Sequence, residues 1–143
     1  MTEIHYQFPV RASAARVFAA IATPEGLDAW WTLQASGSPG AGNVYALGFG
    51  AGYEWGAIVS VCVEDAAFEF TMMRADADWE GTKVGFLLAE KGGTTEVRFY
   101  HAGWSRENDH YRISSFCWAM YLRLLRRYCE SGEVTRYDDR LEA

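Results

Sequence analysis

A chain of 143 residues is long enough for one domain and too short for two, and half of its residues are hydrophobic. That supply of apolar side chains can build one core without a metal or a disulfide framework. The net charge of -6 disfavours the basic face that nucleic-acid binding needs. The longest apolar runs fall short of the roughly 20 residues that span a bilayer, so we expect no membrane insertion.

The three cysteines, Cys62, Cys117 and Cys129, form no CxxC pair and stand among apolar neighbours. They are expected to be reduced core residues, as is usual in a cytoplasmic protein. The first residues lack a basic segment followed by an apolar one, so we expect no signal peptide.

The first third of the chain predicts one strand and two short helices. Apolar and polar residues alternate over 4–10, which indicates a half-buried strand. Ser13 is a suitable N-cap for a helix that runs to Ala22. Thr23 and Pro24 begin a second helix, because proline is favoured at the first helical position. This helix should end in Trp30-Trp31, of which only one can face inward if both are helical.

Residues 34–42 are rich in Gly, Ser, Pro and Ala, which predicts a loop. Five strand-like runs follow, over 43–49, 53–63, 67–73, 82–90 and 94–103. Short turns separate most of them, so they should form an antiparallel meander rather than a parallel sheet. The acidic segment 76–81 is a longer loop, in which Trp79 could be a lid residue or simply exposed.

The last predicted element is a long helix from residue 108 or 109 to Glu130, ended by Gly132. Spacing at 100° per residue gives it an inner face made of Ser114, Cys117, Tyr121, Leu124, Leu125 and Tyr128. Arginines gather on the opposite face. Residues 1–132 should therefore form one domain, and the charged tail over 133–143 should be loosely ordered.

These elements predict an α+β fold, with a curved antiparallel sheet of about six strands. Two short helices follow the first strand, and the long C-terminal helix lies over the sheet. One helix cannot fill the concavity of a strongly curved sheet, so a cavity between helix and sheet is expected.

Several segments resemble the START/Bet v 1-like superfamily, and more narrowly its branch homologous to the activator of Hsp90 ATPase. They are 10–18, 23–27 with Trp30-Trp31, 56–61, 68–72 and 118–132. The resemblance covers nearly the whole chain and implies a helix-grip fold with a cavity under the last helix. It does not imply one reaction, because the superfamily holds lipid carriers, polyketide cyclases, hydroxylase subunits and co-chaperone domains.

His101 is the polar residue most able to carry chemistry. It shares a strand face with Val97 and Phe99, so its imidazole should point towards the interior. There it could bind a polar ligand group or act as an acid or base, or it could be a histidine with all its hydrogen bonds satisfied by the protein. Tyr121 on the last helix is a candidate partner for it. Glu54 could be a general base if it were buried.

The remaining candidate cavity residues are mainly aromatic, which suits a hydrophobic or aromatic ligand. With those three, the predicted ligand-binding set is His101, Tyr121, Trp30, Trp55, Phe70, Phe86, Phe99, Ser114, Cys117, Trp118, Leu125 and Glu54. Neither a metal site nor a cofactor is predicted, because no three ligands converge in the pattern.

Three functions fit the sequence. The first is a binding protein for a small hydrophobic molecule, and the second is an enzyme of the polyketide cyclase/dehydratase kind. The third, ranked last, is a co-chaperone of an Hsp90-type protein, as the resemblance suggests. Spare edge strands and an outward Phe116 could support a homodimer.

Overall fold

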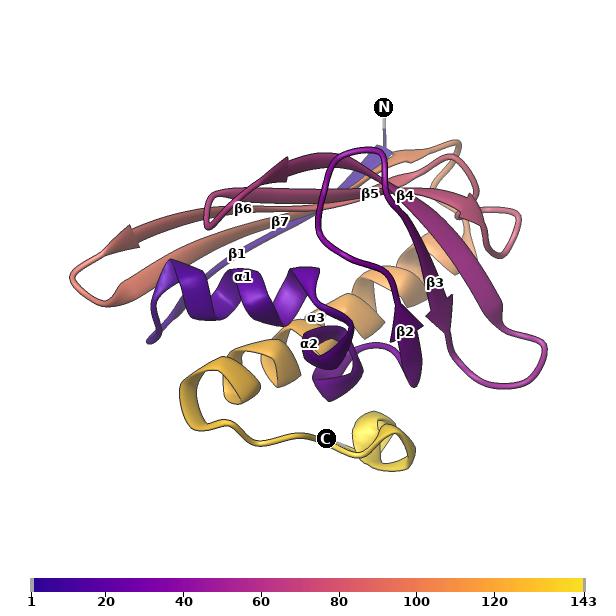
Figure 1. The fold of residues 1–143 in the computed structure, drawn as a ribbon. Coiled ribbons are helices and arrows are strands. Elements are labelled where there is room, and N and C mark those ends of the chain that lie inside the picture. Colours follow the sequence, from indigo (N-terminus) through magenta and orange to yellow (C-terminus); the bar gives the residue numbers. More distant parts are fainter. Residues whose placement is uncertain (1, 143) are drawn as a thin grey trace.

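The computed structural model describes residues 2–142, in which one antiparallel sheet carries all the helices on one face (Figure 1). The sheet has seven strands in the order β1-β7-β6-β5-β4-β3-β2. The strands are β1 (Thr2–Val10), β2 (Gln34–Ser36), β3 (Val44–Gly48), β4 (Glu54–Val63), β5 (Ala67–Arg74), β6 (Lys83–Lys91) and β7 (Thr94–Trp104). The helices are α1 (Ala14–Ala22), α2 (Pro24–Trp30), α3 (Asp109–Ser131) and the short 3-10 helix η1 (Tyr137–Glu142).

The strands from β2 to β7 form a meander, in which each pairs antiparallel with the next along the chain. The first strand, β1, joins this meander at its far end by pairing with β7. The two edges of the sheet are therefore β1 and the three-residue strand β2. The predicted α+β helix-grip fold is confirmed, with seven strands rather than about six.

The additional strand is β2, which lies at the start of the predicted loop over 34–42. Its composition did not indicate a strand, and tertiary contacts hold it in place. It pairs with β3 through three residues, and the Ala35 amide donates to Asp28 Oδ1 at 2.8 Å. The side chain of a residue in α2 therefore fixes the path of this edge.

The helix ends follow local sequence signals. The Ser13 hydroxyl accepts from the Arg16 amide at the start of α1, and the Thr23 hydroxyl accepts from the Gly26 amide at the start of α2. Asn108 caps α3 by accepting from the Tyr111 amide at 3.0 Å. Gly132 ends α3 with a φ of 78°, a left-handed conformation that glycine adopts without steric cost.

The buried face of α3 is rotated slightly from the predicted one. Its buried residues are Ser114, Trp118, Leu122, Leu124, Leu125 and Cys129. Cys117, Tyr121 and Tyr128 of the predicted face are only half-buried. The bulky Trp118 side chain fills the space between helix and sheet, and this sets the rotation of the helix about its axis. None of the helices within residues 2–142 has the length and apolar character required to cross a membrane.

The interior holds both Trp30 and Trp31, which are 0% and 3% exposed. The prediction that only one of them could face inward was wrong, because it assumed that both are helical. Trp31 is the C-cap of α2, with φ −123° and ψ −66°, so the chain has already left the helix there. The two rings stack with their centroids 6.0 Å apart.

The C-terminal segment does not match the predicted loose tail. It crosses beneath α2 (Figure 1), where Arg140 is 2% exposed. The guanidinium donates to the carbonyl oxygens of Asp28 at 2.6 Å, Thr32 at 3.0 Å and Thr135 at 3.0 Å. A cation at the carbonyl end of α2 also interacts favourably with the helix dipole. Composition alone could not reveal these contacts.

Replacing Arg140 with methionine should free this segment, because methionine keeps much of the apolar stem but cannot donate a hydrogen bond. We expect a loss of about 1–3 kcal/mol in the free energy of unfolding, since buried carbonyls lose their donor. Faster amide hydrogen exchange in residues 133–142 should accompany it. Arg136→Met is the matched control, because Arg136 is an exposed arginine of the same segment. Equal effects of the two substitutions would contradict the anchoring role of Arg140.

Candidate functional site

The space between the sheet and α3 holds a cluster of aromatic rings, here called the aromatic interior. Its members are Trp30, Trp31, Trp55, Trp79, Phe86, Phe99, Trp104 and Trp118. Trp118 of α3 lies at its centre, with ring centroids 4.6 Å from Phe99, 5.2 Å from Trp31 and 5.8 Å from Trp79. Stacked and edge-to-face rings of this kind bury large apolar areas and interact favourably through their quadrupoles.

His101 lies fully buried inside this cluster, as its alternation on β7 predicted. The Trp118 indole N–H donates to His101 Nδ1 at 3.0 Å. Since an indole nitrogen can only donate, Nδ1 is unprotonated and the ring hydrogen is on Nε2. Nε2 lies 2.9 Å from Thr82 Oγ1, and that hydroxyl donates to the Trp79 carbonyl at 2.5 Å. Both ring nitrogens of His101 therefore have partners within the protein.

Burial strongly disfavours the charged form of this histidine. It lowers the pKa of His101 to about 3, and repulsion from His110 acts in the same direction. At neutral pH the imidazole is uncharged, and its hydrogen-bonding groups are satisfied. This geometry matches the structural interpretation of His101 more closely than a role as an acid or base.

Trp79 enters the aromatic interior from the loop between β5 and β6. Its side chain is 7% exposed, although its loop neighbours Asp76, Ala77 and Glu80 are exposed. The Trp79 indole N–H donates to Ser114 Oγ at 3.1 Å, and its ring lies 4.4 Å from the ring of His101. Trp79 is therefore a core residue, although it belongs to a loop.

The same loop is attached to the start of α3 by Asp78. Its carboxylate accepts from Asn108 Nδ2 at 3.2 Å and lies 3.1 Å from His110 Nδ1. These hydrogen bonds lower the pKa of Asp78. The loop is thus held by polar contacts at its surface and by one indole ring in the interior.

One polar atom of the aromatic interior has no hydrogen-bond partner. Within residues 2–142, the buried side-chain atoms of this kind are Trp104 Nε1 and Thr135 Oγ1. Trp104 is 3% exposed and its ring centroid lies 4.9 Å from that of His101. A buried donor without an acceptor costs about 1–3 kcal/mol, so an acceptor placed there would be favoured.

The structure places the twelve predicted cavity residues in different surroundings. Eight are buried, namely Trp30, Phe70, Phe86, Phe99, His101, Ser114, Trp118 and Leu125. Of these, Ser114 and His101 contact Trp79 and Trp118, while Phe70 packs on Tyr45 and Phe68 away from them. Whether these residues bind a ligand stays a prediction.

The other four lie nearer the surface. Tyr121, Cys117 and Trp55 are half-buried, and Glu54 is exposed. Burial raises the pKa values of Tyr121 and Cys117, so both are protonated at neutral pH. Glu54 lines an open surface hollow of about 540 Å³ with Trp55 and Arg74, at the end of the sheet that carries β2.

Four residues of the site were not in the predicted set: Trp31, Thr82, Trp79 as a core residue, and Trp104. Trp104 faces inward because Gly103, with a φ of 89°, interrupts the alternation of β7. The indole thereby occupies the face that position 103 would have taken. In the sequence, a glycine followed by tryptophan at a strand end could have indicated that Trp104 faces inward. No sequence feature indicated Thr82, because only the tertiary structure brings it to His101.

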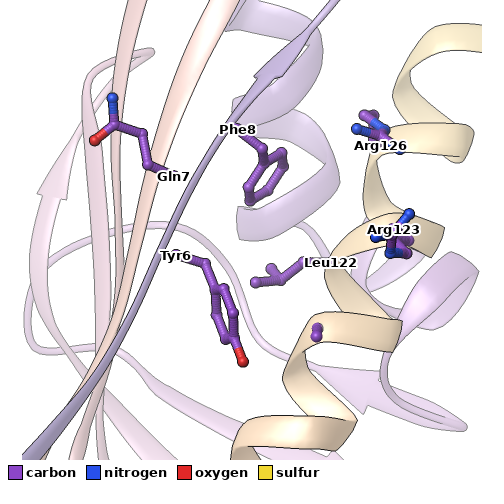
Figure 2. A pocket seen from close by; sticks show the side chains of 7 residues that line it. Tyr6, Gln7, Phe8, Leu122, Arg123 and Arg126 are labelled. Carbon is purple, nitrogen blue, oxygen red and sulfur yellow. The ribbon is translucent and has the colours of Figure 1, made fainter.

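A second feature is a groove on the surface between β1 and α3, of about 210 Å³. Figure 2 shows Tyr6 and Phe8 of β1 directed towards α3, with Leu122, Arg123 and Arg126 on the helix side. None of its lining residues belongs to the aromatic interior, although Tyr6 packs against Phe99 of that cluster from outside. On the outward side of α3, Ile113 and Phe116 are 60% and 80% exposed.

Comparison with known proteins agrees with this architecture. The family described as "Activator of Hsp90 ATPase homolog 1-like protein" matches residues 11–130. A search of curated proteins finds no match. The Aha1 dimer from Colwellia psychrerythraea is similar in structure, with a TM-score of 0.82 and 26% identity over 92% of this chain and 98% of that one.

Two further solved structures share the fold at lower identity. CalU16 from Micromonospora echinospora has a TM-score of 0.71 and 18% identity over 98% of this chain and 83% of that one. DynU16, a protein of the dynemicin biosynthetic locus, has a TM-score of 0.79 and 20% identity over 95% of this chain and 50% of that one.

Proposed function

We propose that the chain, which belongs to the Activator of Hsp90 ATPase homolog 1-like family, binds a small aromatic molecule between the sheet and α3. The observation that carries the proposal is Trp79, a loop residue whose buried ring stacks on Trp118 inside the aromatic interior. In this proposal the ligand takes the place of that ring when the loop moves outward. The surroundings of Trp79 then define what the ligand must be.

Those surroundings favour a flat, fused-ring molecule of about the size of an indole. Trp118 lies almost parallel to Trp79, with 22° between the planes, and offers a stacking surface. Ser114 Oγ, which accepts from Trp79, would accept from a ligand hydroxyl or N–H. The unpartnered Trp104 N–H would donate to a ligand oxygen. A polycyclic phenol or ketone could stack on Trp118 and form a hydrogen bond with Ser114 or Trp104.

Binding to such a closed site depends on how often the loop opens, because the apparent dissociation constant equals the intrinsic constant divided by the populated fraction of the open state. Asp78 holds the loop to Asn108 and His110, so weakening it should favour the open state. The proposal thus predicts that a change at the surface, away from the ligand, tightens binding.

The probe for this experiment is 2-naphthol, titrated into the protein and followed by calorimetry and by the indole N–H resonances. We expect Asp78→Ala to tighten apparent binding about threefold to tenfold. Glu80→Ala is the matched control, because it removes the same charge from an exposed position of the same loop. In the unaltered protein the Trp79 indole resonance should shift on binding. Equal affinities of the two variants, or an unmoved Trp79 resonance, would contradict the proposal.

The alternative of a cyclase-like enzyme would require His101 to give up one of its two hydrogen bonds. If His101→Ala still turned over an identified substrate at the same rate, His101 would have no catalytic role. A co-chaperone role and a homodimer also stay proposals. The dimer of the Colwellia protein and the exposed Phe116 support the homodimer.

A further inference from the structure

The groove between β1 and α3 is bordered by the free edge of a strand. β1 pairs with β7 and forms one edge of the seven-stranded sheet. Proline is accepted in an edge strand where its nitrogen points away from the ladder, and Pro9 lies in β1. Because main-chain groups alternate along a strand, those of Gln7 and His5 point the same way as Pro9, towards the free edge.

The floor of the groove is apolar and still reaches solvent. Tyr6 and Phe8 point towards α3 but are only half-buried, in contrast with Ile4 and Val10 on the same face of β1. Leu122 closes the floor from the helix side. An extended segment beside β1 would therefore place every second side chain on an apolar surface.

Both ends of the groove are closed by contacts with α3, one from β1 and one from Arg11, the residue that follows β1. At one end the Tyr6 hydroxyl donates to the Ser115 carbonyl at 2.8 Å. At the other end the Arg11 amide donates to Glu130 Oε2 at 2.8 Å. Four residues of β1, 7–10, lie between these contacts, and the five steps from Tyr6 to Arg11 span about 17 Å of extended chain. A bound segment of five or six residues would fit this length.

The rim of the groove carries two arginines, which also line a neighbouring hollow with Arg127 and Glu130. In the part of the chain that the structure describes, Arg123 and Arg126 form no salt bridge, whereas Arg127 on the next position pairs with Glu133 at 3.5 Å. The chain as a whole carries 13 basic and 19 acidic residues. Two unpaired guanidinium groups beside one groove are therefore a local exception in an acidic protein, and they would complement carboxylates.

We propose that this groove binds an extended acidic segment of a partner protein, which adds to the free edge of β1 and places carboxylates on Arg123 and Arg126. Strand addition supplies main-chain hydrogen bonds, while the apolar floor and the arginines supply specificity. The volume of about 210 Å³ is below the roughly 300–1,000 Å³ of usual small-molecule pockets. An open groove beside a strand edge suits a peptide better than an enclosed ligand.

The test uses the peptide Glu-Thr-Val-Thr-Glu-Thr, acetylated and amidated so that its ends are uncharged. Its alternate residues place two carboxylates and one valine on the same side. Fluorescence anisotropy of a labelled peptide should show saturable binding below about 1 mM. Replacing both glutamates with lysine should abolish binding. The affinity of the glutamate peptide should fall as sodium chloride rises, because exposed charges are screened.

Arg126→Gln should weaken binding about tenfold, and Arg123→Gln should act in the same direction. Arg127→Gln is the matched control on the same helix and should change affinity less than twofold. The Gln7 amide should exchange more slowly with solvent when the peptide is bound. Equal binding of the lysine peptide, equal effects of Arg126→Gln and Arg127→Gln, or an unprotected Gln7 amide would each overturn the proposal. So would a second copy of the chain that occupies the groove in solution.

Discussion

Replacing His101 with alanine is expected to lower the free energy of unfolding by about 3–5 kcal/mol. The substitution leaves a cavity in the aromatic interior and removes the acceptor of the Trp118 indole N–H. It also removes the partner of Thr82 Oγ1. Urea denaturation followed by far-ultraviolet circular dichroism gives the free energy. The matched control is His5→Ala, which removes an exposed histidine of β1 and should change stability by less than about 0.5 kcal/mol.

A second variant separates the hydrogen bond from the cavity. In His101→Asn the amide oxygen can take the place of Nδ1 and accept from Trp118, but the side chain is too short to reach Thr82 in the same way. We therefore expect His101→Asn to lower the free energy of unfolding by about 1–3 kcal/mol, which is more than His5→Ala and less than His101→Ala. If His101→Ala cost less than about 1 kcal/mol, the network through Trp118 and Thr82 would not be a main contributor to the stability of the interior.

Acidification should destabilise the protein through the same histidine. In the unfolded chain His101 has an ordinary pKa near 6.5, and in the fold burial lowers it to about 3. Between these values the unfolded state binds a proton that the folded state does not bind. The contribution of the uncharged His101 to the free energy of unfolding is therefore complete above pH 6.5 and is lost as the pH falls towards 3. The expected change in the folding equilibrium constant is about tenfold per pH unit.

The comparison of the unaltered protein with His101→Asn isolates this effect, because all other titrating groups are shared. The stability advantage of the unaltered protein should be largest at pH 7 and should shrink steadily down to pH 4. Chemical denaturation at half-unit pH intervals measures it. An advantage that stays constant over this range would mean that His101 has the same pKa in the folded and unfolded states, and that its environment is less apolar than the contacts with Trp118 and Trp79 imply.

The two proposed sites depend on different residues. Ligand binding in the aromatic interior depends on the loop that carries Trp79 and on its tether at Asp78. Peptide binding depends on the edge of β1 and on Arg123 and Arg126, which belong to the surface. Substitutions at Asp78 should therefore leave peptide affinity unchanged, and Arg126→Gln should leave 2-naphthol affinity unchanged. A failure of one proposal does not entail a failure of the other.

The sequence by itself determined the order of the elements and most of their ends. Alternation marked the long strands, capping residues marked the helix starts, and Gly132 marked the end of α3. These signals are local, since each depends on residues within a few positions of one another. The inward direction of His101 was also a local inference, because it followed from its place on the same strand face as Val97 and Phe99.

Only the tertiary structure decided what the interior contains. β2 depends on Asp28 and β3, the C-terminal segment depends on the buried Arg140, and Trp79 depends on the space left beside Trp118. His101 could be placed in the interior from the sequence, but its partners could not, because Thr82 is 19 positions away and Trp118 is 17 positions away. Periodicity fixes which way a side chain points, whereas the atoms that it meets depend on how the elements pack against one another.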